Sequence, residues 1–206
     1  MAQLKYYYDL MSQPSRALYM FLKLNKIPFE EKPVALRKGE HKTEEYKKIH
    51  PFHLVPALHD GDFKLTESLA IVEYLMSTQN AADHWLPRTD ARKRAKLIIP
   101  RATGKPVDQE KVKKGRENVK RVVKDLESYF LKDTPFLSSN EITVADIFGA
   151  CELMQLYAVL EEGLYESSPI VKAWMARVRE RTNPQFDEAN VMVYRVRDMY
   201  KKLAKL

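Results

Sequence analysis

Hydrophobic and polar positions over the first 24 residues predict a strand, a tight turn and a helix. Residues 5–8, Lys-Tyr-Tyr-Tyr, are an aromatic run typical of a short β-strand. The polar segment 9–16 interrupts it, and Pro14 suits the first turn of a helix, where its missing N–H has no partner to lose. Apolar side chains then follow at helical spacing, at Ala17, Leu18, Phe21, Leu22 and Leu24. Ser12 therefore lies where a strand ends and a helix begins.

The following residues predict the rest of a small α/β domain. Residues 28–36 form an extended segment parallel to the first strand, because a helix connects the two. Val55-Pro56 leads into a short strand, and Asp60-Gly61 is a two-residue hairpin signal before a return strand. Helical spacing resumes after residues 66–68, at Leu69, Val72, Leu75 and Met76. A βαβ unit followed by a hairpin and a helix is a compact α/β arrangement.

From Thr89 onward no segment has a strand pattern, and the remaining chain is predicted to be helical. The first helix occupies residues 90–99, and Asp108 caps the second. The second should face inward with Val112, Val119, Val122, Val123, Leu126, Tyr129 and Phe130. We therefore expect an α/β domain of residues 1–79, a linker of residues 80–87 anchored by Trp85, and an all-α domain of residues 88–206.

Three further helices are predicted in the second half. Residues 143–146, Thr-Val-Ala-Asp, resemble a capping box with Asp in place of Glu, and they open a helix that carries Cys151. Pro169 opens another, which the sequence Thr182-Asn183-Pro184 ends. Its inward-facing residues are expected to be Ile170, Val171, Trp174 and Val178. The last helix is predicted to begin near Asp187 and to continue into a basic tail.

The junction at Ser12 has a chemical consequence. Unpaired N–H groups and the positive end of the helix dipole meet at a helix start, and both favour an anion. A hydroxyl group there can donate a hydrogen bond, and a thiolate bound there would have its thiol pKa lowered from about 8.5 toward neutrality. The alternative is that Ser12 only caps the helix. Residues 66–68, Thr-Glu-Ser, form a second such junction and a second candidate anion site.

Composition limits the possible partners and setting. The net charge is +7, and residues 88–132 hold 15 Lys and Arg against 6 Asp and Glu. This excess lies on predicted helices without interleaved aromatic residues, which favours a solvated helix face over a nucleic-acid site. The single cysteine, Cys151, excludes an intrachain disulfide and fits a reducing compartment. No apolar run of about 18 residues and no secretory pattern occurs, so we expect a cytoplasmic protein without a membrane partner.

Several motifs then indicate a family. In the first half they are residues 8–17 (YDLMSQPSRA), 38–41 (KGEH), 54–58 (LVPAL), 60–63 (DGDF) and 65–68 (LTES). In the second half they are residues 136–137, 142–146 and 182–184. In order and spacing, this set resembles the theta-class glutathione transferases over nearly the whole chain. The resemblance implies a thioredoxin-like α/β N-terminal domain followed by an all-α C-terminal domain.

The resemblance also implies an activity. The enzyme would conjugate the glutathione thiolate to small hydrophobic electrophiles such as alkyl halides and epoxides, with glutathione as co-substrate, no cofactor and no metal. A homodimer is the implied assembly. In the theta-class motif a serine replaces the tyrosine of other classes, so Ser12 would stabilise the thiolate. Tyr6, Tyr7 and Tyr8 offer a tyrosine-type alternative, but they precede the turn and belong to the strand.

Further residues are implied to bind glutathione. Val55 would pair its backbone with the cysteinyl backbone of glutathione, and the bond to Pro56 would be cis. Glu67 would hold the γ-glutamyl amine, Ser68 and its helix start would hold the carboxylate, and His41 would approach the glycyl end. The implied glutathione-binding residues are His41, Leu54, Val55, Glu67 and Ser68. Without the resemblance, His41 would be a solvated loop residue, Glu67 a complement to the helix dipole and Ser68 a cap.

One departure from the family pattern concerns the start of the helical domain. Only residues 97–103 separate its first helical segment from the turn at residues 104–106. The family pattern has a long helix and a second helix there, so roughly two dozen residues are missing, equivalent to about 36 Å of helix. We therefore expect a shortened glutathione transferase fold. The alternative function is a catalytically impaired short isoform that acts as a glutathione-binding or protein-interaction module through uncovered apolar surface.

Overall fold

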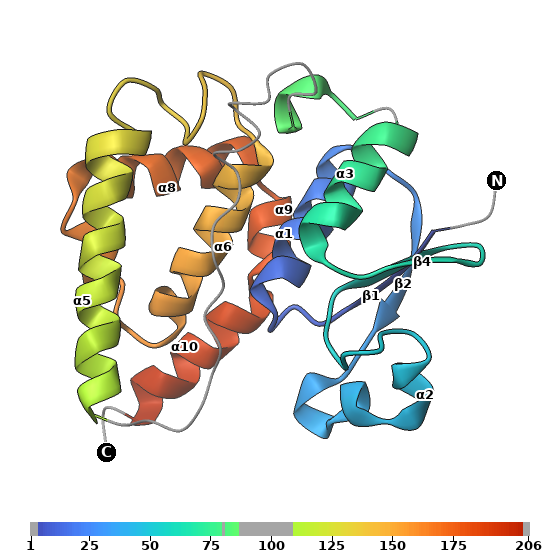
Figure 1. Ribbon diagram of the computed structural model, residues 1–206. Coiled ribbons are helices and arrows are strands. Elements are labelled where there is room, and N and C mark those ends of the chain that lie inside the picture. The colour runs from blue at the N-terminus through green and yellow to red at the C-terminus, as the bar shows by residue number, and fades with distance from the viewer. Residues whose placement is uncertain (1–3, 80, 87–108, 204–206) are drawn as a thin grey trace. The chain divides into compact units, whose positions relative to one another are not determined.

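The structure is a computed structural model that describes residues 4–79, 81–86 and 109–203 (Figure 1). The chain forms two compact units. One contains residues 1–83 together with residues 182–195, and the other contains residues 84–181 and 196–206. The first unit is α/β and the second is helical, as the sequence predicts.

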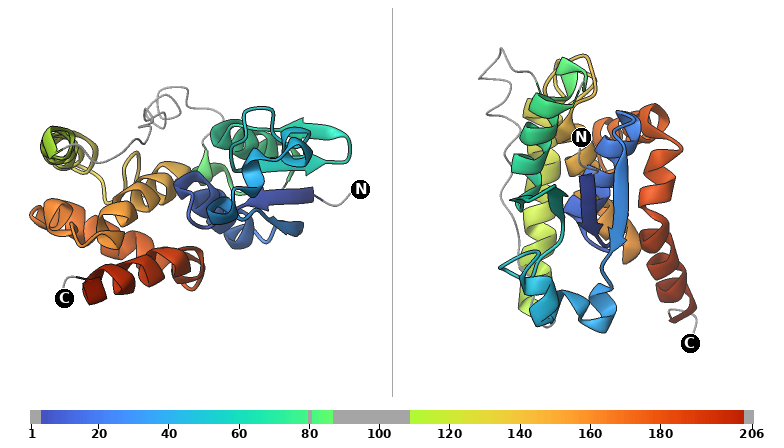
Figure 2. Two further views of the ribbon diagram at one scale, coloured as in Figure 1. Left: turned by 90° about the horizontal axis from the view of Figure 1, so that it is seen from below. Right: turned by 90° about the vertical axis from the view of Figure 1, so that its right-hand side faces the viewer.

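A four-stranded mixed sheet forms the centre of the first unit. Its strands are β1 (Leu4–Tyr8), β2 (Phe29–Pro33), β3 (Ala57–Asp60) and β4 (Phe63–Leu65). The strand order is β2-β1-β3-β4. Strand β1 runs parallel to β2, and the two lie side by side in the right-hand view of Figure 2. Strand β3 is antiparallel to both β1 and β4, which confirms the predicted βαβ unit and the hairpin at Asp60-Gly61.

Helices α1 and α3 complete the core of this unit. The helical segments are α1 (Gln13–Leu24), η1 (Leu36–Lys38), η2 (Glu40–Lys42), α2 (Glu44–Lys47), α3 (Ser68–Thr78) and α9 (Gln185–Ala189). Helix α1 buries its predicted apolar face and packs against α3 and α9. It ends at Asn25, whose side-chain amide donates to the Phe21 carbonyl over 2.8 Å. The first helix is thus fixed between the sheet and two other helices.

The described part of the second unit is built from helices. They are η3 (Asp83–Trp85), α5 (Gln109–Asp125), the π-helical turn η4 (Leu126–Phe130), α6 (Val144–Ala158), α7 (Gly163–Glu166) and α8 (Pro169–Thr182). Trp85 is buried, as predicted for the anchor of the linker. The predicted helix at residues 90–99, the turn at residues 104–106 and the cap at Asp108 lie outside the described residues, as does the side chain of Val112.

The start of α6 confirms the predicted capping box of Thr143 and Asp146. Both the backbone N–H and the hydroxyl of Thr143 donate to Asp146, over 2.8 and 2.9 Å. The other carboxylate oxygen accepts from the Leu137 N–H and the Trp174 indole N–H, each over 2.8 Å. Cys151 is buried on the same helix. Asp146 therefore holds together three segments of the helical unit.

Three inward-facing predictions are wrong. Val122 is 45% exposed and Tyr129 is 64% exposed, whereas Val123 and Leu126 are buried. Val122 precedes Val123 by one residue, which is about 100° around a helix, so only one of them faces the core. The π-helical turn η4 then changes the register before Tyr129. Ile170, 40% exposed, is turned out in the same way beside the buried Val171.

The last predicted helix is two helices. Helix α9 ends at Ala189, and α10 (Val191–Leu203) begins two residues later. Between them Asn190 is fully buried, and its side-chain amide donates to the Phe186 carbonyl over 2.9 Å. Apolar spacing continues across this break, so the pattern alone did not reveal it. None of the helices in residues 4–79, 81–86 and 109–203 combines the length and the apolar character needed to cross a bilayer.

Candidate functional site

The register of the sheet brings four loops to one edge of the first unit. Tyr8, the end of β1, pairs with Pro33, the end of the parallel strand β2. Tyr7 pairs with Ala57 at the start of the antiparallel strand β3. The start of β3 in turn lies beside the end of β4. The segments that follow β1, β2 and β4 and precede β3 therefore leave the sheet at the same edge. They carry Ser12, His41, Leu54-Val55 and Glu67-Ser68.

Ser12 lies at the end of a tight turn. The Ser12 N–H donates to the Asp9 carbonyl over 2.9 Å, and the Met11 N–H donates to the Asp9 carboxylate over 2.9 Å. These two bonds define a β-turn reinforced by an Asx-turn. Ser12 has an extended backbone and is the N-cap of α1, with Pro14 in the first turn of the helix as predicted.

The Ser12 hydroxyl has two long contacts. It accepts from the Ser15 N–H over 3.4 Å and donates to the Val55 carbonyl over 3.4 Å. Hydroxyl hydrogen bonds are ordinarily 2.7–2.8 Å long, so both contacts are weak. Ser12 is half-buried. It is therefore a helix cap, as the simpler interpretation predicts, and also a donor that a better acceptor could engage.

Two charged residues that sequence reasoning missed hold this turn. Arg16 is fully buried, and its Nη1 donates to the Leu10 carbonyl over 2.9 Å and the Met11 carbonyl over 3.2 Å. Asp9 accepts the Met11 N–H on one oxygen and the Leu36 N–H, over 3.0 Å, on the other. The sequence did hold a signal for Arg16, because this charged residue directly precedes the apolar residues Ala17 and Leu18 in the helix. The contact of Asp9 with Leu36 left no local signal.

The segment that contains Leu54 and Val55 is held by buried side chains of the β2–β3 connection. Val55 is buried in a cluster with Val34 and Tyr46, and the Tyr46 hydroxyl donates to the Leu54 carbonyl over 2.8 Å. Burial of Tyr46 is the main cause of its raised pKa, which keeps the hydroxyl a donor. The Val55–Pro56 bond is cis, as predicted. Leu54 itself is exposed.

Glu67 and Ser68 form the start of α3. Glu67 is exposed and has φ 60° and ψ 105°. This backbone conformation is unfavourable for residues other than glycine. Such residues cost about 1–3 kcal/mol each and occur often at binding sites. Glu67 is the N-cap, but no side-chain bond from it caps the helix. Ser68 is buried in the first turn.

His41 lies in the short turn η2. Its carbonyl lies 2.8 Å from Nδ1 of His53, which has φ 55°. Nδ1 of His41 itself is enclosed and, among the described residues, has no hydrogen-bond partner. Among the site residues, Ser12 forms a hydrogen bond with Val55. His41, Glu67 and Ser68 lie on loops at the same edge of the sheet but form no hydrogen bond with Ser12 in the described part of the chain.

The tyrosines of β1 have other partners. The Tyr6 hydroxyl donates to the Ser15 carbonyl over 2.7 Å, and the Tyr8 hydroxyl donates to Glu31 over 2.8 Å. Burial, together with Glu31, raises the pKa of Tyr8. The Tyr7 ring packs against His59, with centroids 4.7 Å apart. This geometry favours Ser12 over the tyrosine-type alternative.

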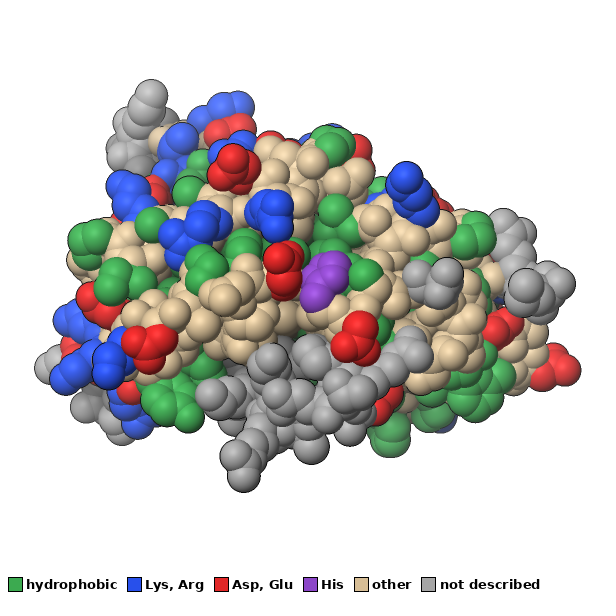
Figure 3. Space-filling view, turned by 90° about the horizontal axis from the view of Figure 1, so that it is seen from above, with side chains coloured by type: hydrophobic (Ala, Val, Ile, Leu, Met, Phe, Trp, Pro, Cys, Tyr) green, Lys and Arg blue, Asp and Glu red, His purple; other side chains and the backbone are tan. Residues whose placement is uncertain are grey.

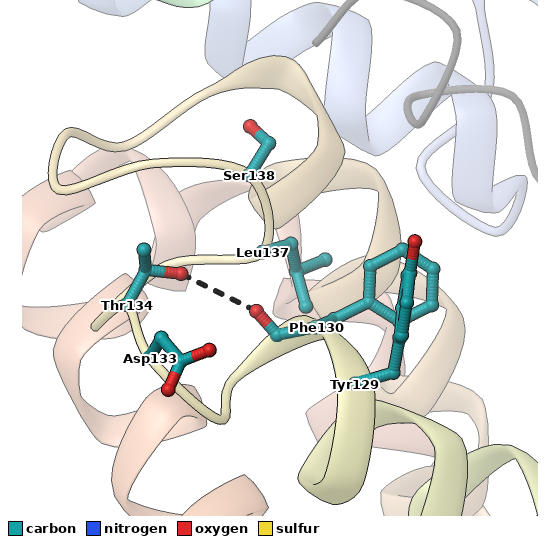
Figure 4. Close-up of a pocket in the computed structure, with 6 residues that line it drawn as sticks. All are labelled: Tyr129, Phe130, Asp133, Thr134, Leu137 and Ser138. Carbon is teal, nitrogen blue, oxygen red and sulfur yellow. Dashed lines mark hydrogen bonds between the residues drawn. The ribbon is translucent and has the colours of Figure 1, made fainter. Parts of the chain in front are cut away.

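A separate hollow lies in the helical unit (Figure 4). Its volume is about 120 Å³, and its lining residues are Tyr129, Phe130, Asp133, Thr134, Leu137 and Ser138. The Thr134 hydroxyl donates to the Phe136 carbonyl over 2.7 Å and also lies 3.3 Å from the Phe130 carbonyl. It contains none of the residues expected to bind glutathione.

Surface charge is mixed on the face shown in Figure 3. Lys and Arg side chains are interspersed with Asp and Glu there. On α5 and its neighbours, Arg116 pairs with Glu161, and Lys120 pairs with Glu117 over 3.2 Å. Paired and interspersed charges of this kind are typical of a solvated surface.

Comparison with known proteins gives the family. Residues 2–77 match the model of the glutathione S-transferase N-terminal domain, and residues 89–182 match that of the C-terminal domain. The mouse glutathione S-transferase theta-2 is 39% identical over 197 residues, which cover 85% of this chain and 80% of the relative. The mouse theta-3 protein is 35% identical over 220 residues, covering 95% and 90%.

Solved structures agree. A crystal structure of human glutathione transferase theta-2, in complex with glutathione and an unknown ligand, superposes with a TM-score of 0.86 at 35% identity. It covers 97% of this chain and 90% of the human one. The alignment to mouse theta-3 spans 220 residues, more than the 206 of this chain, so the relative has residues that this chain lacks. The chain therefore belongs to the glutathione S-transferase family, within its theta class.

Proposed function

We propose that this protein conjugates glutathione to small hydrophobic electrophiles, with the Ser12 hydroxyl stabilising the thiolate. The observation that carries the proposal is the weakly engaged hydroxyl at the start of α1, with its two 3.4 Å contacts. On binding, this hydroxyl would exchange the Val55 carbonyl for the glutathione sulfur. It would still accept from the Ser15 N–H, which polarises the O–H and strengthens its donation.

The other loops at the same sheet edge supply groups that match the rest of glutathione. The Val55 backbone would pair with the cysteinyl backbone of the tripeptide. The exposed Glu67 carboxylate would hold the γ-glutamyl ammonium, and the start of α3 at Ser68 would bind the adjacent carboxylate. The half-buried His41 ring would donate to the glycyl carboxylate.

The chemistry required of the protein is modest. The thiolate sulfur attacks an electrophilic carbon and forms a C–S bond. With an alkyl halide the halide leaves with the bonding electrons, and with an epoxide the C–O bond opens and the oxygen takes a proton from water. Ser12 lowers the thiol pKa and the loops orient the sulfur, so catalysis consists of thiolate stabilisation and positioning.

We propose a cytoplasmic homodimer as the functional form. Sedimentation equilibrium would test the dimer.

The test compares the parent protein with Ser12→Ala, using an epoxide and an alkyl halide. Removing one hydrogen-bond donor to a developing or stabilised anion costs about 10²–10³-fold in rate, so kcat/KM should fall by that factor. The apparent pKa of bound glutathione should return toward about 8.5. A Ser12→Ala variant that keeps activity within about threefold of the parent would contradict the serine mechanism.

Ser15→Ala is the matched control. Ser15 lies one helical turn from Ser12 and is fully buried, and its hydroxyl has no hydrogen-bond partner among the described residues. Removing that hydroxyl should leave both the rate and the thiol pKa unchanged. Calorimetry with glutathione completes the test, because loss of turnover with retained binding separates a chemical role of Ser12 from a binding role.

One observation favours a second function, that of a protein-interaction module. Val122 on α5 and Tyr129 on η4 expose apolar surface in the helical unit. Exposed apolar patches bind partners or cause aggregation. A parent protein that neither turns over nor binds glutathione, but elutes as a larger species and binds an apolar dye, would support this alternative.

A further inference from the structure

We propose that Asp9 is a positioning residue that couples the turn carrying Ser12 to the loop carrying His41, and thereby sets the thiol pKa of bound glutathione. This inference rests on the proposed function. The two segments concerned are the serine turn, residues 9–12, and the β2–α2 loop, residues 34–43. They follow different strands of the sheet and would contact different ends of the tripeptide.

The Asp9 carboxylate joins these two segments directly. One oxygen accepts the Met11 N–H over 2.9 Å, inside the serine turn. The other accepts the Leu36 N–H over 3.0 Å, at the start of η1 in the β2–α2 loop. The Asp9 backbone carbonyl also accepts the Ser12 N–H over 2.9 Å. A single residue therefore fixes the backbone of Ser12 and the direction of the loop that leads to His41.

The chemistry of the carboxylate makes this link specific. An ionised carboxylate only accepts, and it can offer one oxygen to each of two N–H donors. Hydrogen bonds to an ionised acceptor are stronger than neutral ones. A second contact reinforces the same link, because Arg37 Nε lies 3.2 Å from the sulfur of Met11.

The consequence concerns the distance between the Ser12 hydroxyl and the sulfur. A hydrogen bond weakens steeply as its length and angle depart from their optimum, so a small shift of the turn would weaken donation to the thiolate. Arg16 holds the Leu10 and Met11 carbonyls on the helix side of the turn. Asp9 holds the Met11 N–H and connects the turn to the neighbouring loop. Releasing Asp9 would remove the carboxylate link to the neighbouring loop and leave the weaker contact between Arg37 and the Met11 sulfur.

Asp9→Asn is the informative substitution. The amide has one accepting oxygen, and its NH₂ group would face an N–H donor, so one of the two segments is released in either orientation. A rise of about one unit in the apparent thiol pKa of bound glutathione is expected. The loss of kcat/KM for the electrophile at saturating glutathione should then approach about tenfold as the pH falls below the thiol pKa of the parent complex. It should nearly vanish above about pH 9, because the thiolate fraction recovers.

Glu40→Gln is the matched control. Glu40 accepts the Ala35 N–H over 2.7 Å, one residue before Leu36, but this bond stays within the β2–α2 loop. Its substitution should leave the thiol pKa of bound glutathione unchanged. A loss of kcat/KM in Asp9→Asn that is equal at every pH, or a thiol pKa that shifts equally in both variants, would overturn the proposal.

Amide hydrogen exchange tests the coupling without turnover. In Asp9→Asn either the Met11 or the Leu36 amide, whichever loses its acceptor, should exchange about tenfold faster. In Glu40→Gln the amide oxygen can still accept the Ala35 N–H, so neither the Ala35 nor the Met11 amide should exchange faster. Unchanged exchange of both the Met11 and the Leu36 amides in Asp9→Asn would overturn the coupling. If Ser12→Ala retains full activity while exchange changes as expected, the proposed function fails and the coupling stands.

Discussion

The starts of α6 and α1 are both capped by polar side chains, but the hydrogen bonds of the two caps differ in length and burial. At α6 the cap is closed, because the Asp146 carboxylate receives donors at 2.8–2.9 Å from Thr143, Leu137 and Trp174, all in buried positions. At α1 the cap is open, because Ser12 is half-buried and its hydroxyl has two contacts of 3.4 Å. A closed cap contributes stability, whereas an open one leaves hydrogen-bonding capacity for a ligand.

The start of α3 extends this comparison. Its N-cap, Glu67, has no side-chain capping bond and an unfavourable backbone conformation. Both open starts belong to the α/β unit and leave the sheet at one edge, whereas the closed start belongs to the helical unit. The start of α6 is thus closed by short buried bonds, whereas the starts of α1 and α3 lack short side-chain capping bonds.

Asp146→Ala should have the largest effect on stability. It leaves the buried N–H groups of Leu137, Thr143 and Trp174 without their acceptor, and each unsatisfied donor costs about 1–3 kcal/mol. We expect a loss of about 4 kcal/mol in the free energy of unfolding, measured in urea. Asp133→Ala, at an exposed aspartate of the same unit, should change it by less than about 0.5 kcal/mol. Equal effects would refute the closed-cap interpretation.

Thr143→Ala and Ser12→Ala compare the two caps directly. We expect Thr143→Ala to cost about 1–2 kcal/mol, because its hydroxyl is buried and bonded at 2.9 Å. Ser12→Ala should cost less than about 0.5 kcal/mol, because its bonds are long. Thermal unfolding of both variants measures the difference. A Ser12→Ala loss as large as that of Thr143→Ala would show that Ser12 is primarily a structural cap.

A smaller effect on the free energy of unfolding, dependent on pH, is expected at Glu162. This residue is ion-paired but partly exposed, so it is intermediate between the buried cap of α6 and the open cap of α1. Its carboxylate accepts from Arg197 over 2.8 Å, and this bond holds the pKa of Glu162 below its ordinary value. The folded state therefore binds the proton less readily than the unfolded state. The stabilisation is complete above the ordinary pKa of about 4.3 and is lost as the pH falls through the folded-state pKa.

Glu162→Gln should therefore cost about 1 kcal/mol at pH 7 and almost nothing near pH 3. Urea unfolding at several pH values measures this. Glu117→Gln is the control, because the Glu117–Lys120 pair is largely exposed and its loss should cost little. A Glu162→Gln effect that is independent of pH would show that packing, and not the ion pair, is responsible.

Local sequence signals predicted much of the fold. Pro14, the Asp60-Gly61 pair and the Thr143–Asp146 box each act within about four residues, so their chemistry is visible without the tertiary structure. The same holds for Ser12, whose place at a strand-to-helix junction follows from the residues on either side. Apolar spacing placed the helices but not their finer boundaries, since it continues across the break at Asn190.

By itself, then, the sequence determined the elements, their order and the family. Only the tertiary structure decided the contact of Ser12 with Val55, 43 residues away, and that of Asp9 with Leu36, 27 residues away. It also decided that Arg16 lies buried beneath the serine turn and that Val122 and Ile170 face solvent. The physical reason is that strand register and helix rotation are set by packing across the whole unit, which no short stretch of residues encodes.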